Sequence, residues 1–219
     1  MPVIVLAATK GGVGKTTLSA VLAVEAARRG MRVALIDLDP QQSLARWHEL
    51  RGVRGHSIEA IRLIEPGKHE ETQAQVRRAL KEGADWVIID TPPALILRIE
   101  PAVSVADLVV VAVQPSPLDV EAIDPIAELA TAHARDFVFV LNRTSPRSKL
   151  TQSAIEYLSA GGEVLDVEVG NRQAYAGAMI DGRTAPEAEP KGASVAEIAS
   201  LWDAIETRVK KTARLKASA

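Results

Sequence analysis

Short apolar runs alternate with longer segments of helical periodicity along the whole chain. Val3–Ala8 and Leu108–Val113 are apolar at every position, and Arg32–Ile36 is apolar at all but its first. Strands that are apolar on both faces are typical of a parallel sheet with helices on each side. The pattern predicts strands over 3–8, 32–36, 57–64, 85–90, 108–113, 137–141 and 164–169. It predicts helices over 16–29, 43–50, 70–82, 120–134, 150–160 and 194–211, and a mixture of loop and helix over 172–182.

This alternation of strands and helices predicts an α/β fold with a doubly wound, mostly parallel sheet. No internal repeat or low-complexity linker interrupts the pattern. A chain of 219 residues with 47% hydrophobic residues has the size and composition of one globular domain with a sizeable core. We therefore expect a single domain over 1–219, with a basic C-terminal tail from about residue 208.

The composition excludes several kinds of site. Because the chain has no cysteine, it has no disulfide, no thiolate zinc site and no cysteine-ligated iron–sulfur cluster, which suits a reducing compartment. No basic leader precedes the first apolar run, and no run approaches the roughly 18 apolar residues that span a bilayer. We therefore expect a cytoplasmic protein that is neither exported nor transmembrane.

A glycine-rich loop separates the first apolar run from the first helical segment. Glycines let successive backbone N–H groups turn inward at the positive end of the helix dipole, where they cradle phosphates. The spacing matches the P-loop pattern GxxxxGK[ST], except that Thr9 replaces the first glycine and Lys10 adds a second lysine. We expect Lys15 to reach the β- and γ-phosphates and Thr16 to bind Mg²⁺. The residues predicted to bind nucleotide here are Lys10, Gly11, Gly12, Val13, Gly14, Lys15, Thr16 and Thr17.

Carboxylates follow two of the predicted strands. Asp37 and Asp39 come directly after the strand 32–36, beside the phosphate loop, which is where open α/β sheets bind ligands. We predict that Asp39 contacts the metal and positions the attacking water. The strand 85–90 ends at Asp90 in the Walker B arrangement, in which a carboxylate holds Mg²⁺ directly or through water.

Two further residues are predicted to contact the nucleotide. Asn142 ends the strand 137–141, and its amide offers a donor and an acceptor that suit adenine, although an ordinary turn asparagine fits the same position. Pro115 lies in the loop after the strand 108–113, where Pro115 and Pro117 fix the backbone shape.

The motifs KGGVGKTT, DLDPQ and IIDTPP resemble those of the deviant Walker A ATPases, and within them the ParA family of DNA-segregation ATPases. The resemblance covers nearly the whole chain. It is closest to the small ParF-like branch, which similarly lacks an N-terminal DNA-binding domain. The residues that carry this closer similarity are Pro115–Asp119, Trp47, the run Arg172-Gln173-Ala174-Tyr175 and the pair Asp181-Gly182.

The resemblance implies a switch driven by ATP and Mg²⁺. ATP binding would make a sandwich dimer in which Lys10 crosses to the partner's phosphates, so that Lys10, Lys15 and Asp39 are the catalytic residues. The ATP dimer would bind nucleoid DNA without sequence specificity, and a ParB-like or other cargo-adaptor protein would stimulate slow hydrolysis. The motifs do not distinguish a plasmid, a chromosome or a protein cargo.

The resemblance leaves other members of this fold as alternatives. The nitrogenase iron protein needs cluster cysteines, and arsenite-pump ATPases usually have two fused halves. A dethiobiotin-synthetase-like ligase would need a carboxylate-substrate site that the sequence does not display. A MinD-like ATPase that binds a membrane surface is the main alternative.

The C-terminal tail bears on the choice between DNA and membrane. Residues 208–216 contain five basic residues and no acidic one, with only Val209 and Leu215 as sizeable apolar groups. A membrane-surface helix needs a wide apolar face, so the tail favours DNA. Alternatively, the tail cations only complement the dipole of the helix end.

Basic residues late in the chain are the candidates for DNA contact. With a formal net charge of −2, the protein can bind a polyanion only through cations that are gathered on one surface. The predicted DNA-binding residues are Arg143, Arg147, Lys149, Arg172, Arg208, Lys210, Lys211 and Arg214.

Overall fold

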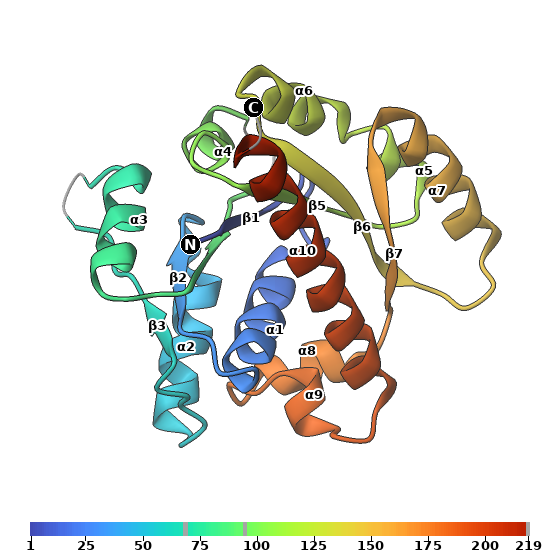
Figure 1. The fold of residues 1–219 in the computed structure, drawn as a ribbon. Coiled ribbons are helices and arrows are strands. Elements are labelled where there is room, and N and C mark those ends of the chain that lie inside the picture. The colour runs from blue at the N-terminus through green and yellow to red at the C-terminus, as the bar shows by residue number, and fades with distance from the viewer. Residues whose placement is uncertain (68–69, 94–95, 218–219) are drawn as a thin grey trace.

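The computed structural model describes residues 1–67, 70–93 and 96–217, with side chains to residue 215. The strands of its sheet are β1 Val3–Ala7, β2 Val33–Asp37, β3 Ile61–Leu63, β4 Trp86–Asp90, β5 Leu108–Val113, β6 Asp136–Thr144 and β7 Glu163–Gly170. They lie in the order β3-β2-β4-β1-β5-β6-β7, and every neighbouring pair is parallel (Figure 1). The predicted parallel α/β sheet is confirmed.

Helices cover both faces of this sheet. The described helices are α1 Lys15–Arg28, α2 Ser43–Val53, α3 Thr72–Lys81, α4 Ile96–Val103, α5 Pro117–Val120, α6 Asp124–Ala132, α7 Lys149–Gly161, α8 Gln173–Met179, α9 Ala185–Ala188 and α10 Ala193–Ala217. One core lies between the sheet and α1, α2, α8, α9 and α10. A second core lies between the other face and α3 to α7. The fold is therefore doubly wound.

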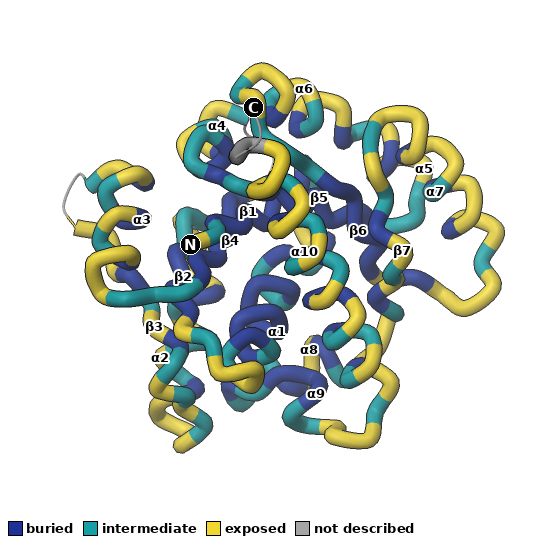
Figure 2. The backbone as a smooth tube through the Cα atoms, in the orientation of Figure 1, coloured by how far each residue is buried: buried dark blue, intermediate teal, exposed yellow. Residues whose placement is uncertain are grey.

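The apolar runs belong to strands that are buried on both faces. In β1, Val3 and Val5 face one core while Ile4 and Leu6 face the other. This double burial explains why the run shows no alternation of apolar and polar residues. Helix α1 packs on the centre of the sheet and is itself buried along most of its length (Figure 2).

Several predicted elements differ from those observed. The single helix predicted over 120–134 is wrong: α5 ends at Val120 and α6 begins at Asp124. Pro125 is the reason, because proline has no N–H to continue a helix and is tolerated only in its first turn. The strand predicted over 57–64 is limited to the three residues of β3, after a turn in which Ile61 N–H donates to the Ile58 carbonyl. Helix α4 was not predicted.

Because all the strands run parallel, their ends form two distinct edges of the sheet. At the carboxyl edge, the glycine loop follows β1, and Asp37 and Asp90 are paired in register at the ends of β2 and β4. Asn142 lies near the end of β6 at the same edge. At the opposite, amino edge, Asp136 and Glu163 begin β6 and β7.

Candidate nucleotide site

The glycine loop has a backbone conformation that requires glycine at two positions. Gly12 has φ 77° and Gly14 has φ 97°, in the left-handed region that side chains disfavour. A Cβ on Gly14 would also lie 2.5 Å from Nδ2 of Asn142. The Gly14 carbonyl accepts from Leu18 N–H at 2.9 Å, which begins the hydrogen bonding of α1. The loop therefore leads directly into a helix N-terminus, as a phosphate cradle needs.

The Asn142 side chain stabilises the glycine loop by a hydrogen bond. Its Nδ2 donates to the Val13 carbonyl at 2.6 Å, and its Oδ1 accepts from Arg143 N–H at 2.9 Å. The side chain is 5% exposed. Both halves of the amide are thus engaged within the protein, and an adenine would have to share or replace these bonds. Support of the loop is a role that the sequence did not predict, and contact with adenine stays a prediction.

Lys15, Thr16 and Asp90 form a polar cluster at the start of α1, in which Lys15 and Asp90 are buried and Thr16 is partly exposed. Burial lowers the pKa of the Lys15 ammonium, while the nearby carboxylates of Asp90 and Asp39 oppose the change. Thr16 Oγ1 donates to Asp90 Oδ2 at 2.6 Å. The Asp90 side chain is fully buried, which raises its pKa to about 7 despite that bond. Its other oxygen, Oδ1, has no hydrogen-bond partner among the described residues.

This cluster fits a magnesium ion. A buried carboxylate oxygen without a partner carries a large desolvation cost, which a cation or its bound water would offset. Oxygen donors such as the Thr16 hydroxyl and the Asp90 carboxylate are those that Mg²⁺ prefers, with substrate phosphates completing the shell. The described residues contain no group of three or more His, Asp or Glu side chains that would hold a metal without such phosphates.

Asp37 and Asp39 have different surroundings. Asp37 accepts from the backbone N–H groups of Asp39 and Ala45, each at 3.0 Å, and burial raises its pKa. It therefore shapes the loop and the start of α2. Asp39 accepts from Gln41 N–H at 2.9 Å and faces the cavity beside the glycine loop. Of the two carboxylates, Asp39 is the one placed to meet a ligand.

Two cavities run along the glycine loop. The first, of about 610 Å³, is lined by Gly11, Gly12, Gly14, Lys15, Thr16, Thr17, Asp39, Gln41, Ser43, Arg46, Trp47, Leu50, Pro93, Arg143, Ala176 and Met179. The second, of about 470 Å³, is lined by Gly14, Thr17, Leu18, Asn142, Arg143, Val169, Gly170, Asn171, Arg172, Gln173, Tyr175 and Ala176. Together they bring most of the predicted nucleotide-binding residues to one continuous region of the carboxyl edge.

Lys10 and Pro115 lie outside these two cavities. Lys10 Nζ donates to the Leu118 carbonyl at 2.5 Å and lies 3.7 Å from Asp119, so α5 holds the second lysine of the loop. Pro115 is in the same segment, where Gln114 Nε2 donates to the Gly12 carbonyl at 3.1 Å. The loop after β5 therefore contacts the glycine loop through Gln114, the residue before Pro115. Direct contact of Pro115 with a nucleotide stays a prediction.

Helices α2 and α8 supply cavity residues that sequence reasoning missed. Arg46 and Leu50 come from α2, and Ala176 and Met179 come from α8. The sequence points to these two helices only through the resemblance to the ParF-like branch, which Trp47 and the run 172–175 carry. Nothing in their local pattern distinguishes them from ordinary helix residues.

The predicted DNA-binding residues divide between the two edges of the sheet. Arg143 lies near the end of β6, and Arg147, Lys149 and Arg172 follow β6 and β7 at the carboxyl edge. The other four belong to the end of α10, where Arg208 contacts Asp136 and Glu163 at the amino edge. The eight candidates therefore do not lie on one surface of the single chain, because β6 and α10 place residues from the late part of the sequence at opposite edges of the sheet. Their contact with DNA stays a prediction.

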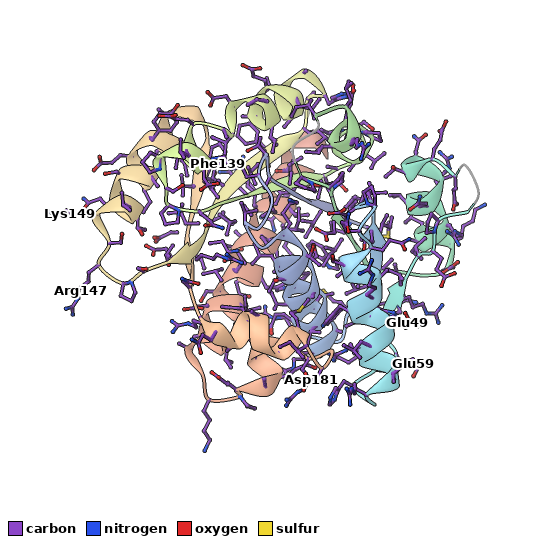
Figure 3. All side chains as sticks on the ribbon, turned by 180° about the vertical axis from the view of Figure 1, so that it is seen from behind. Glu49, Glu59, Phe139, Arg147, Lys149 and Asp181 are labelled. Atoms are coloured by element: carbon purple, nitrogen blue, oxygen red, sulfur yellow. The ribbon has the colours of Figure 1, made fainter. Side chains whose placement is uncertain are left out.

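Some of these cations are also paired. Arg208 forms ion pairs with two carboxylates, Arg172 binds Glu197, and Lys210 lies 3.0 Å from Glu206. Arg147 and Lys149 point away from the body of the molecule (Figure 3). The side chain of Lys216, the last basic residue of the tail, lies outside the described residues.

Among the described helices, none has the length and apolar character needed to cross a bilayer.

Comparisons with known proteins agree with a nucleotide-binding site at the glycine loop. Residues 4–185 match the family described as the CobQ/CobB/MinD/ParA nucleotide binding domain. The chain is 32% identical over 198 residues to the maintenance of carboxysome distribution protein A of Halothiobacillus neapolitanus, covering 86% of this chain and 88% of that protein. It is 30% identical over 188 residues to protein ParA of Rhizobium radiobacter, covering 80% and 81%.

Among solved structures, the cell division ATPase MinD of Pyrococcus furiosus has the same fold, with a TM-score of 0.76. That likeness covers 94% of this chain and 98% of the MinD chain at 19% identity, so it concerns the fold alone. The matches over most of the chain's length support the resemblance to ParA proteins that the motifs indicated. This protein therefore belongs to the CobQ/CobB/MinD/ParA nucleotide-binding family, as one of its ParA-type members.

Proposed function

We propose that this protein is an ATP-hydrolysing partitioning protein that dimerises on ATP, binds DNA without sequence specificity and positions a plasmid, chromosome or protein cargo. The observation that carries the proposal is the preformed cluster of Lys15, Thr16 and Asp90 at the end of a glycine loop, with Asp39 facing the same cavity. Similarity to a ParA protein and to a carboxysome-distribution protein supports the class of function. Membership of the ParF-like branch stays a prediction.

The chain's own groups divide the work of hydrolysis. The N–H groups of the glycine loop and the Lys15 ammonium would bind the phosphates, and Thr16 and Asp90 would hold Mg²⁺. When bound, the metal ion would neutralise charge on the phosphate oxygens. Asp39 would orient the attacking water beside the metal ion, because it is the carboxylate that faces the cavity without accepting from the backbone of α2.

Lys10 connects hydrolysis to dimerisation. In the single chain its ammonium is held by the Leu118 carbonyl and lies near Asp119. In the proposed ATP dimer it leaves α5 and reaches the phosphates bound by the partner, so turnover depends on assembly. A ParB-like or other adaptor protein then stimulates a slow intrinsic rate, and release from the nucleoid follows hydrolysis.

The tail of α10 favours DNA over a membrane surface. Val209 is 6% exposed and packs in the core, so among the described tail residues only Leu215, at 63% exposure, presents a large apolar side chain to solvent. A membrane-surface helix needs a wide apolar face. Lys210, Lys211 and Arg214 instead lie on one surface with Thr207 and Leu215. The described part of this helix therefore gives no support to the MinD-like alternative.

Co-sedimentation tests the proposal against that alternative. The protein is incubated with ATP or ADP and Mg²⁺, then centrifuged with long duplex DNA of mixed sequence or with vesicles that contain anionic lipid. We expect sedimentation with DNA in ATP, little in ADP, and none with vesicles. Sedimentation with vesicles in ATP but not with DNA would favour the MinD-like function. Equal DNA binding in ATP and ADP would contradict the switch.

A further inference from the structure

Helix α8 is held firmly at its first turn. It lines both cavities of the nucleotide site, chiefly through Ala176. Arg172 Nε donates to Glu197 Oε1 at 2.9 Å, and the Tyr175 hydroxyl donates to Glu197 Oε2 at 2.9 Å. Glu197 belongs to α10, so the run 172–175 fastens the start of α8 to the last helix of the chain.

The segment after α8 is held against α2. Gly182 has φ 81°, and a Cβ there would lie 2.6 Å from both Cα and N of Arg51, so only glycine allows this approach. Arg51 Nη1 donates to the Gly182 carbonyl at 2.8 Å. The run 172–175 and the pair Asp181-Gly182 therefore hold the two ends of α8.

A buried ion pair completes the contact between α2 and the α8–α9 segment. Arg51 is 2% exposed, and its guanidinium binds both carboxylate oxygens of Glu187, at 2.9 and 2.5 Å. It also lies 5.4 Å from the ring centre of Trp47, in a cation–π arrangement. Glu187 in turn accepts from Thr184 N–H and Oγ1 in the capping box of α9.

The charge state of Glu187 agrees with this geometry. Burial opposes its ionisation, yet the bonds from Arg51 and Thr184 hold its pKa below the ordinary value. A buried ion pair contributes little net stability compared with apolar packing, whereas loss of one partner leaves an uncompensated charge. What such a pair supplies is a fixed geometry between the elements that carry it.

The elements fixed by this pair are two walls of the nucleotide cavity. Trp47 and Leu50 of α2 line it, as does Met179 of α8. The opposite end of α2 contacts the segment that carries Asp37 and Asp39, since Ala45 N–H donates to Asp37. In Figure 3, Glu49 marks α2 and Asp181 marks the segment after α8. Neither Arg51 nor Glu187 lines the cavity.

We propose that Arg51 and Glu187 are positioning residues of the nucleotide site, whose ion pair holds α2 and the α8–α9 segment at the spacing that a bound nucleotide requires. The inference rests on the proposed function and deepens it. Its consequence is that nucleotide affinity depends on two side chains that touch no nucleotide.

Titration of a fluorescent ADP analogue with Mg²⁺ tests the proposal. The variants are Arg51→Met, Glu187→Gln and the double variant Arg51→Met/Glu187→Gln, measured well below their unfolding temperatures. The matched control is Arg29→Met, which removes an arginine that joins α1 to α10 through Glu25 and Asp203, away from the cavity. We expect Arg51→Met to weaken binding about tenfold, because small displacements of site walls are costly.

The double variant separates positioning from unrelated damage. If both residues act through one pair, the double variant binds no more weakly than Arg51→Met, whereas independent effects would multiply. Arg29→Met is expected to lower the unfolding temperature without changing affinity.

Two results decide against the positioning role of the pair, and a third decides against the proposed function. One is an unchanged dissociation constant for Arg51→Met alongside a lowered unfolding temperature, which would make the pair purely structural. If Arg51→Met does not fold, the test rests on Glu187→Gln, because this variant removes the charge and keeps a side-chain oxygen that can accept from Thr184. Unchanged nucleotide affinity in Glu187→Gln would then overturn the inference. Failure of the unmodified protein to bind nucleotide would overturn the proposed function itself, which is a distinct result.

Discussion

The two edges of the sheet hold charge in different ways. At the carboxyl edge, the ionisable groups of Lys15 and Asp90 are buried, and their neighbours are placed by backbone and side-chain bonds. At the amino edge, Arg208 is fixed by two carboxylates, while Lys210 and Lys211 stand exposed on the end of one helix. Chemistry that depends on geometry uses buried, constrained groups, whereas binding to a polyanion needs only accessible cations.

Removing the carboxylate that faces the cavity is expected to have the largest effect. Asp39→Ala should lower ATP turnover by about a hundredfold or more, because the attacking water loses its positioning group. Nucleotide affinity should stay nearly unchanged, since the glycine loop is intact, and an ATP dimer should accumulate. Phosphate release and light scattering measure the two outcomes. A variant that remains monomeric in ATP would argue against this role for Asp39.

The two lysines of the glycine loop should separate binding from turnover. Lys15→Ala should weaken ATP binding by about a hundredfold, the size of effect expected for a buried charge-assisted hydrogen bond. Lys10→Ala is the matched control. It should bind ATP normally, because Lys10 contacts α5 outside the cavity. It should fail to hydrolyse ATP, because in the proposed dimer Lys10 acts on the phosphates of the partner. Titration of a fluorescent ATP analogue decides, and equal affinity losses in both variants would refute the division.

Carboxylates at the two edges should give opposite pH dependences of stability. Burial raises the pKa of Asp90 to about 7, so the folded protein retains a proton that the unfolded chain lacks above about pH 4. The free energy of unfolding contributed by Asp90 therefore falls as the pH rises from about 4 to about 7. Burial also opposes ionisation of Asp136, but bonds from Arg208 and Thr212 hold its pKa below the ordinary value. Its contribution is present above the unfolded pKa and is lost on acidification.

Urea unfolding without metal or nucleotide, at several pH values from about 3 to about 7, checks these signs. Asp90→Asn should gain stability relative to the unmodified protein as the pH rises from about 4 to about 7, while Asp136→Asn should lose it as the pH rises from about 3 to about 4. The same pH dependence in both variants would mean that the two edges do not differ in this way.

The smallest expected effect concerns the tail. Lys210→Ala/Lys211→Ala should reduce the slope of log affinity for DNA against log salt by about 1.8, which corresponds to two phosphate contacts. ATP affinity should not change. The matched variant Arg147→Ala/Lys149→Ala removes two exposed cations at the carboxyl edge instead. Whichever pair flattens the slope identifies the edge that binds DNA, and a loss of slope in neither variant would exclude both.

Local patterns in the sequence were sufficient for the sheet and for the phosphate cradle. The apolar runs predict strands because burial on both faces leaves no place for polar residues, and β5 was predicted residue for residue. The spacing of Gly14, Lys15 and Thr16 predicts the loop because the required backbone angles depend on those residues themselves. Both are properties of neighbours along the chain.

The contacts that shape the site join residues far apart in the chain, and for these the arrangement of the strands was needed. Asn142 supports Val13 across 129 residues, and Arg51 meets Glu187 across 136. The same arrangement places Arg147 and Lys210 at opposite edges of the sheet although both come late in the sequence. The sequence gives the chemical type of each side chain, but the partner of a side chain depends on which strands and helices pack together. The physical reason is that side chains become buried and find hydrogen-bond partners between elements as well as within them.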